Sequence, residues 1–162
     1  MFRSCRNCKK CYNCNCLSST SVGNKAFYGT PISSLTIKAG KTKTIGERAF
    51  QNCDSLTTVT IPGNVETIGG RAFQGCAILR SVTLNEGLKT IGGSVNYSDY
   101  GAFSQCVKLP AITFPSTVTS IANHAFYGCS SLSSIVFRGS ASDVSIGKST
   151  FGGCPGTPSY QK

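Results

Sequence analysis

The sequence is poor in the side chains that carry out catalysis. It contains one histidine, no tryptophan and only six acidic residues among 162. General acid–base and nucleophilic catalysis need histidine, carboxylate or activated cysteine groups held close together. No two acidic residues share a motif with hydrolase spacing, and the phosphate-binding pattern G-x-x-x-x-G-K-[ST] is absent. The sequence therefore predicts a protein that is not an enzyme.

Long apolar runs are also missing. No stretch reaches the roughly 18 apolar residues that a membrane-spanning helix needs. The first ten residues, MFRSCRNCKK, lack the apolar segment of a secretion signal. The sequence therefore predicts no transmembrane segment. Three alternatives stay open for its location: the protein stays inside the cell, it leaves by another route, or its true N-terminus lies upstream of Met1.

Negative charge is scarce, and the positive charge is uneven. The formal net charge is +10, from 16 basic and 6 acidic residues. Residues 1–48 hold nine lysines and arginines against one acid, a net of +8, while residues 49–162 hold seven against five, a net of +2. The basic N-terminal third therefore predicts a possible contact with an anionic polymer.

What the sequence does have is a repeat. The segments IGERAFQNC, from Ile45, and IGGRAFQGC, from Ile68, are nearly identical and lie 23 residues apart. A third unit starts at Ile91 with seven extra residues, and later units start at Ile121 and Ile146. A degenerate copy of the repeat, NKAFYGTPISSLTIK, precedes these units. A fixed period of this size predicts coils that stack, because one unit cannot bury its apolar side alone.

Each unit combines two local patterns. The stretch TTVTIP alternates threonine with apolar residues and ends in a Pro-Gly turn, as a half-buried strand does. The next apolar residues, Ile45, Ala49, Phe50 and Cys53 in the first clear unit, lie about one helical turn apart. The repeat therefore predicts stacked parallel strands joined by short helical or 3-10 returning segments, with a column of threonines on the outer strand face.

The stretch LTTVTIPGNVETIGGRAFQGC resembles the BspA-like leucine-rich repeat, LxxVxIPxxVTxIGxxAFxxC. The resemblance implies a β-rich leucine-rich-repeat solenoid of about five coils over residues 22–154. A mobile, cysteine-rich basic extension (1–21) would precede the solenoid, and a C-terminal tail (155–162) would follow it. The resemblance also implies a non-enzymatic cell-surface or adhesion-type protein that binds a protein or glycan. The alternative is an intracellular interaction scaffold tethered through its N-terminal cysteines.

The ten cysteines fall into two groups. Five occupy the same slot of successive units and predict a column of small, buried, reduced thiols: Cys53, Cys76, Cys106, Cys129 and Cys154. The other five lie in CRNCKKCYNCNC, where Cys5, Cys8, Cys11 and Cys14 offer four thiolates for tetrahedral zinc. Acylation beside the neighbouring basic residues, disulfide formation and a disordered tail are the alternatives for this segment. No other cofactor is expected.

Three cations share one slot of consecutive units. Lys25, Arg48 and Arg71 each stand immediately before the Ala-Phe pair, with His124 in the same slot later. Stacking would bring these cations within a few ångströms of one another, which costs Coulomb energy unless water or an anion screens them. The column predicts either a groove for a sulfated or carboxylated glycan, anionic lipid or nucleic acid, or a solvated face.

The seven-residue insertion, SVNYSDY, predicts a surface loop. Its Tyr97 and Tyr100 offer amphipathic contact surface for a partner. Asn96 begins an N-x-S sequon, which a eukaryotic secretory route could glycosylate. A tolerated loop without a partner is the alternative.

Both ends of the repeat region lack a polar cap. The tail PGTPSYQK shows no strand pattern, so the last unit looks half built. Because stacked-coil proteins normally need capped ends, we expect a fragment or self-association through the ends.

Overall fold

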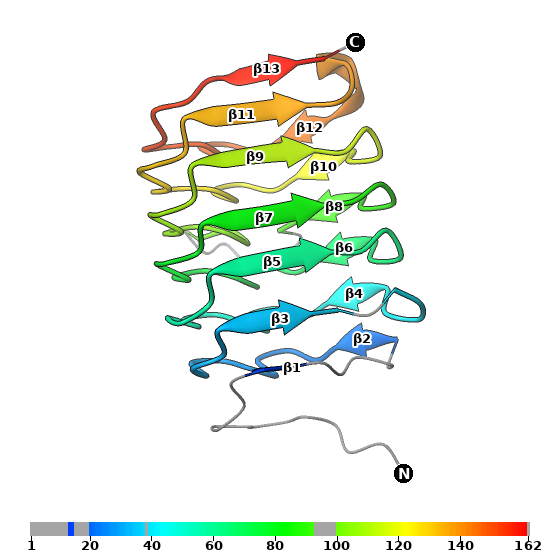
Figure 1. The fold of residues 1–162 in the computed structure, drawn as a ribbon. Coiled ribbons are helices and arrows are strands. Elements are labelled where there is room, and N and C mark those ends of the chain that lie inside the picture. Colours follow the sequence, from blue (N-terminus) through cyan, green and yellow to red (C-terminus); the bar gives the residue numbers. More distant parts are fainter. Residues whose placement is uncertain (1–12, 15–19, 38, 93–99, 162) are drawn as a thin grey trace.

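The computed structural model describes residues 13–14, 20–37, 39–92 and 100–161. The described residues form a stack of coils, each lying directly on its neighbour (Figure 1). A coil contains a longer strand, a turn, a two-residue strand and a second series of turns. The expected β-rich solenoid of stacked parallel strands is confirmed.

The two-residue strands form one continuous parallel sheet with a strand from each of six coils, rather than about five. Successive isoleucines are in register along it, with Ile45 beside Ile68 and Ile68 beside Ile91. The strands, in spatial order, are β2 (Ser21–Val22), β4 (Thr44–Ile45), β6 (Thr67–Ile68), β8 (Thr90–Ile91), β10 (Ser120–Ile121) and β12 (Ser145–Ile146).

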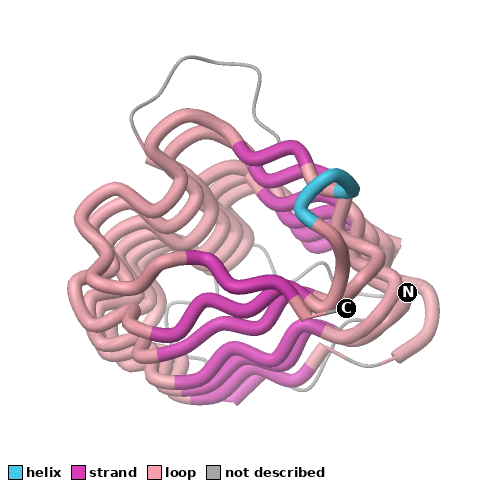
Figure 2. Tube along the Cα trace, turned by 90° about the horizontal axis from the view of Figure 1, so that it is seen from above, coloured by secondary structure: helices cyan, strands magenta, loops and turns pink. Residues whose placement is uncertain are grey.

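The longer strands lie on another side of the stack, and they form two parallel sheets (Figure 2). One sheet contains β1 (Asn13–Cys14), β3 (Ser34–Thr36), β5 (Thr58–Ile61) and β7 (Ser81–Leu84). The other contains β9 (Ala111–Phe114), β11 (Ser134–Phe137) and β13 (Pro158–Tyr160). Strands β1 and β13 lie outside residues 22–154, the range expected for the solenoid, and extend the sheets at both ends. The tail therefore forms a strand, which its sequence pattern did not indicate.

The core runs the length of the stack as columns of like side chains. Phe27, Phe50, Phe73, Phe103 and Phe126 stack ring on ring, with centroids 5.0 to 5.2 Å apart. This spacing matches the roughly 4.8 Å between neighbouring strands. Each ring is at most 1% exposed. The repeated letters of the sequence are thus the residues that must fit the coil above and the coil below.

The returning segments are turns rather than helices. In the described part of the chain the only helix is the 3-10 helix η1 (Ala141–Asp143). Most returning segments contain two residues with left-handed backbone, such as Arg48 (φ 56°) and Asn52 (φ 57°), and this conformation ends a right-handed helix. Backbone groups in these segments form hydrogen bonds to the neighbouring coil instead. For example, Phe50 N–H donates to Ala72 O at 2.7 Å.

Candidate functional site

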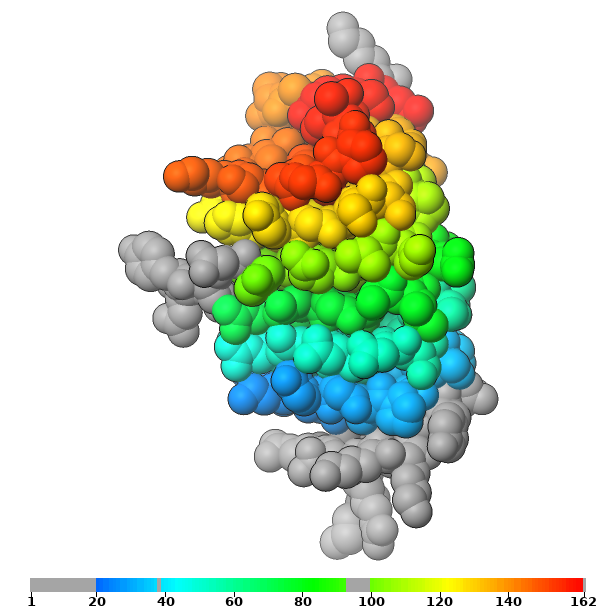
Figure 3. All heavy atoms as spheres, turned by 90° about the vertical axis from the view of Figure 1, so that its left-hand side faces the viewer, coloured from blue at the N-terminus to red at the C-terminus, as the bar shows by residue number. Residues whose placement is uncertain are grey.

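The returning turns place the three predicted cations around one pocket. Lys25, Arg48 and Arg71 line a cavity of about 420 Å³ together with Tyr28 and Gln51. The side of the stack that carries these turns faces the viewer in Figure 3, where each coil forms one band. We call this cavity the basic pocket. The structure therefore brings together the three cations that the repeat predicts to be neighbours.

Backbone geometry fixes the origin of each cationic side chain. Lys25, Arg48 and Arg71 have φ of 55°, 56° and 59°, in the left-handed region that non-glycine residues rarely occupy. Lys25 N–H donates to Glu47 O at 2.9 Å, and Arg48 N–H donates to Gly70 O at 3.0 Å. Because these bonds tie neighbouring coils together, the side chains leave the stack from equivalent points.

The guanidinium groups in the basic pocket are incompletely bonded. The Nε atoms of Arg48 and Arg71 are buried and have no hydrogen-bond acceptor among the described residues. Glu47 Oε1 lies 3.4 Å from Arg48 Nε, close enough for an ion pair. Within that same part of the chain, Lys25 and Arg71 form no ion pair. A buried donor without an acceptor costs about 1–3 kcal/mol, so an anionic oxygen here would be favourable.

Two other cations on the stack share one carboxylate. The Glu66 carboxylate binds Lys43 Nζ at 2.8 Å and Lys89 Nζ at 3.0 Å, bridging three coils. Hydrogen bonds from Lys43 and Lys89 lower the pKa of Glu66 to about 2. Lys43 belongs to the basic N-terminal third, so that part of the chain contributes less free charge than its composition indicates.

The cationic column ends after three coils. Its slot in the next coil holds the buried Gly101, and the coil after that holds His124 at φ 58°. The His124 ring contacts the Tyr127 ring edge-on at 5.6 Å and does not line the basic pocket. The column therefore places three cations in the pocket, and the histidine lies apart.

Two residues of the basic pocket were missed by the sequence reasoning. Tyr28 and Gln51 each lie three residues after a cation, on the same face of the turn. Gln51 Nε2 donates to Gln74 Oε1 at 2.6 Å, and the Tyr28 side chain is exposed. Both residues could have been predicted from the repeat, because they occupy the position three residues after the cation in their units.

The repeat cysteines line the core. All five are free thiols, and only Cys154 is more than slightly exposed. Each Sγ donates to the phenylalanine carbonyl of the preceding coil, as Cys106 does to Phe73 O at 3.3 Å. Burial raises the pKa of Cys106 to about 12. A hydrogen bond with Cys129 lowers the pKa of Cys154. Four of the thiols are therefore poor nucleophiles and poor metal ligands.

Several predicted sites lie outside the described residues. Cys5, Cys8 and Cys11, Tyr97 and Asn96 fall there, and for Cys14 only the backbone is described. The zinc, acylation and glycosylation hypotheses therefore stay predictions. Tyr100, at the end of the insertion, is described and is exposed.

Two further properties concern the described ranges only. No cluster of three or more histidine, cysteine or acidic residues that could hold a metal ion occurs in them. The same ranges contain no helix long and apolar enough to cross a membrane.

Comparisons with known proteins agree with the repeat. A family model for the BspA type leucine-rich repeat region matches six copies over residues 1–101 and 96–160. No curated protein matches the chain. A leucine-rich repeat protein from Bacteroides ovatus is 26% identical with a TM-score of 0.70, and the match covers 85% of this chain and 33% of that one.

Two more solved structures share the fold. The pneumococcal vaccine antigen PcpA is 21% identical with a TM-score of 0.62, over 78% of this chain and 29% of that one. A leucine-rich repeat protein of T. pallidum is 24% identical with a TM-score of 0.59, over 83% and 70%. The chain thus spans about a third of the length of the first two proteins. The family model covers nearly the whole chain, and the chain belongs to the BspA type leucine-rich repeat family.

Proposed function

We propose that this chain is a non-enzymatic binding module of a cell-surface or adhesion-type protein, and that its basic pocket holds a sulfated or carboxylated glycan. The observation that carries the proposal is the set of three cations, from three successive coils, around one cavity. Successive coils repeat these charges at about 4.8 Å. A polymer with regularly spaced anionic groups matches that arrangement better than a single small anion does.

The backbone of the cationic column supports a binding role. Left-handed backbone costs a non-glycine residue about 1–3 kcal/mol, and such residues cluster at functional sites. The second left-handed column of the coils is mostly glycine, as at Gly29, Gly75 and Gly128. The first column instead holds Lys25 and Arg48 and their counterparts. The chain thus keeps long cationic side chains at positions whose backbone conformation glycine adopts without steric cost.

The other lining residues favour a glycan over a nucleic acid. Binding of single-stranded nucleic acid normally uses several aromatic side chains on which successive bases stack. The basic pocket has one tyrosine, Tyr28, and the amide of Gln51. A tyrosine ring and an amide suit the apolar face and the hydroxyl groups of a sugar.

Titration calorimetry with heparin, as the sulfated-glycan probe, tests the ligand class. The double variant Arg48→Asn, Arg71→Asn removes two charges, and asparagine tolerates the left-handed backbone. We expect its affinity for heparin to fall about tenfold or more at low salt, since each charged hydrogen bond contributes about 1.5–3 kcal/mol. Lys108→Asn, at an exposed position outside the pocket, is the control. Equal losses in both proteins, or none, would contradict the proposal.

Surface location is tested on the source cells. Antibodies against the folded chain are expected to stain intact, unpermeabilised cells. Staining that requires permeabilisation would contradict the adhesion role and favour the tethered intracellular scaffold.

A further inference from the structure

Over the described residues, the sheet of longer strands is interrupted once, between β7 and β9. Every other neighbouring pair of longer strands is hydrogen-bonded, whereas β7 ends one sheet and β9 begins another. The sheet of two-residue strands continues across the same level, because β8 pairs with β10. The coils therefore keep their backbone pairing on the side of the two-residue strands and lose it on the side of the longer strands.

Proline explains the interruption at the start of β9. In other coils the residue before the strand donates its N–H to the preceding coil, as Arg80 does to Thr57 O at 2.9 Å and Ser133 to Pro110 O at 3.0 Å. Pro110 occupies this position before β9 and has no N–H to donate. Within the described residues no backbone hydrogen bond reaches the Arg80 carbonyl.

A second proline follows β9. The residue after β7, Asn85, donates its N–H to Ile61 O at 3.1 Å. Pro115 takes the equivalent position after β9 and has no N–H to donate to the Leu84 carbonyl. One proline alone is tolerated, because Pro62 follows β5 and the β3–β5 ladder persists. Among the strands that the structure describes, only β9 has proline on both sides.

Side chains hold the coils together beyond Pro115. Ser116 N–H and Thr117 N–H donate to the Glu86 carboxylate at 3.2 and 3.3 Å. Gly87 N–H donates to Thr117 Oγ1 at 2.9 Å, and this hydroxyl donates to Leu88 O at 2.9 Å. These bonds fix the Pro115 end of the gap and occupy Glu86.

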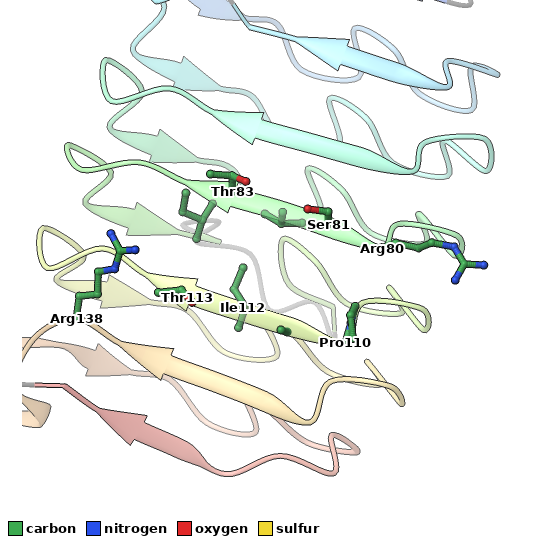
Figure 4. A pocket seen from close by; sticks show the side chains of 10 residues that line it. Arg80, Ser81, Thr83, Pro110, Ile112, Thr113 and Arg138 are labelled. Carbon is green, nitrogen blue, oxygen red and sulfur yellow. The ribbon is translucent and has the colours of Figure 1, made fainter.

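The gap is a groove of about 330 Å³, near the lower limit of the cavities that bind small ligands. The outer faces of β7 and β9 line it with the hydroxyls of Ser81, Thr83 and Thr113. Figure 4 shows the guanidinium of Arg138 beside the C-terminal ends of both strands, while the Arg80 side chain is directed away from them. Arg138 forms no ion pair with any residue the structure describes.

We propose that this groove is a second binding site, independent of the basic pocket, and that it takes one or two units of a uronic-acid saccharide. The sugar carboxylate binds the Arg138 guanidinium, whose planar fork fits a carboxylate with two parallel bonds. Sugar hydroxyls both donate and accept, so they match the unpaired carbonyls and the threonine hydroxyls together. A peptide strand does not fit, since it would need the two strands to separate by a further strand spacing of about 4.8 Å.

The test uses digalacturonate as the probe and neutral digalactose as its uncharged counterpart. In amide NMR titrations of the whole chain, we expect digalacturonate to shift the signals of Thr83, Thr113 and Arg138. Arg138→Gln should weaken digalacturonate about tenfold and leave digalactose unchanged. The double variant Arg48→Asn, Arg71→Asn should bind digalacturonate normally, so that failure of this site is distinguishable from failure of the basic pocket.

A second variant closes the groove and keeps Arg138 and the hydroxyl side chains that line it, while it replaces the lining residue Pro110. Pro110→Ser and Pro115→Asn together restore both missing donors, using the residues found at these positions in other coils. We expect this protein to melt at a higher temperature and to lose digalacturonate binding, whereas the control Pro62→Asn binds normally. The proposal would be overturned if digalacturonate still bound after closure of the groove, or if it did not bind at millimolar concentration. It would also be overturned if the NMR shifts were confined to the basic pocket, or if a Glu-Glu dipeptide bound equally well.

Discussion

At the scale of single residues, the cations before the Ala-Phe pair favour binding but lower the stability of the fold. Arg71 has φ of 59°, a backbone conformation that glycine adopts without steric cost. Glycine loses more conformational freedom on folding, which offsets part of the gain. We expect Arg71→Gly to raise the free energy of unfolding by about 0.5–1 kcal/mol and to weaken heparin binding. Urea unfolding and calorimetry measure the two effects. A loss of stability would show that the arginine side chain stabilises the fold.

The buried thiols predict a sensitivity to alkaline pH. The folded chain raises the pKa of Cys106 from 9.0 to about 12 by burial. Below pH 9 the thiol is protonated in both states, and its contribution to stability is fully present. Between pH 9 and 12 only the unfolded thiol ionises, so stability falls by about 1.4 kcal/mol per pH unit for this group.

Urea unfolding between pH 8 and 10 measures that fall. In Cys106→Ser the hydroxyl does not titrate in this range, so its free energy of unfolding should fall between pH 8 and 10 by about 1.4 kcal/mol less than that of the wild-type chain, with most of the difference above pH 9. Parallel curves for the two proteins would show that Cys106 is accessible to solvent in the folded state.

At the scale of elements, the sequence predicts the repeated parts well. Strand β5 and its counterparts follow from the alternating TTVTIP pattern, and the core columns follow from the period, because each residue must match its own copy in the next coil. The conformation of the returning segments was harder to predict. The spacing of Ala49, Phe50 and Cys53 suits a helix or a turn, and only the left-handed backbone at Arg48 and Asn52 decides between them.

Non-repeated features were the least predictable. Strand β13 forms because a neighbouring strand edge is available, although its own residues show no alternation. The break beside β9 was readable from Pro110 and Pro115, since proline has no donor for a ladder. The basic pocket was half predicted: the repeat identified its cations, whereas Tyr28 and Gln51 depend on which face of the turn points outward.

The side-chain bonds beyond Pro115 give an element-level prediction. Thr117→Val removes the acceptor for Gly87 N–H and the donor to Leu88 O while keeping the side-chain volume. We expect it to lower the free energy of unfolding by about 1–3 kcal/mol, because the backbone groups lose partners. Thr119→Val, which loses only a 3.4 Å bond to Lys89 O, is the control. Equal urea midpoints for the two variants would contradict this role.

At the scale of the whole molecule, stability comes from contacts between neighbouring coils. Phe103 lies inside the phenylalanine column, 5.0 Å from Phe73 and 5.2 Å from Phe126, and is fully buried. Phe103→Ala is expected to cost about 3–5 kcal/mol. Phe151→Ala, at a half-buried ring, should cost clearly less. Urea unfolding compares them, and equal costs would mean that the column does not act through its neighbours.

The central claim is that the stack holds an anionic polymer on three consecutive cations. The most direct measurement is the salt dependence of heparin affinity, because each ionic contact adds close to one unit to the slope of log Kd against log salt. The wild-type slope is expected to exceed that of Arg48→Asn, Arg71→Asn by about two units, while Lys108→Asn keeps the wild-type slope. Equal slopes in all three proteins would contradict the claim, since the anion would then be bound elsewhere.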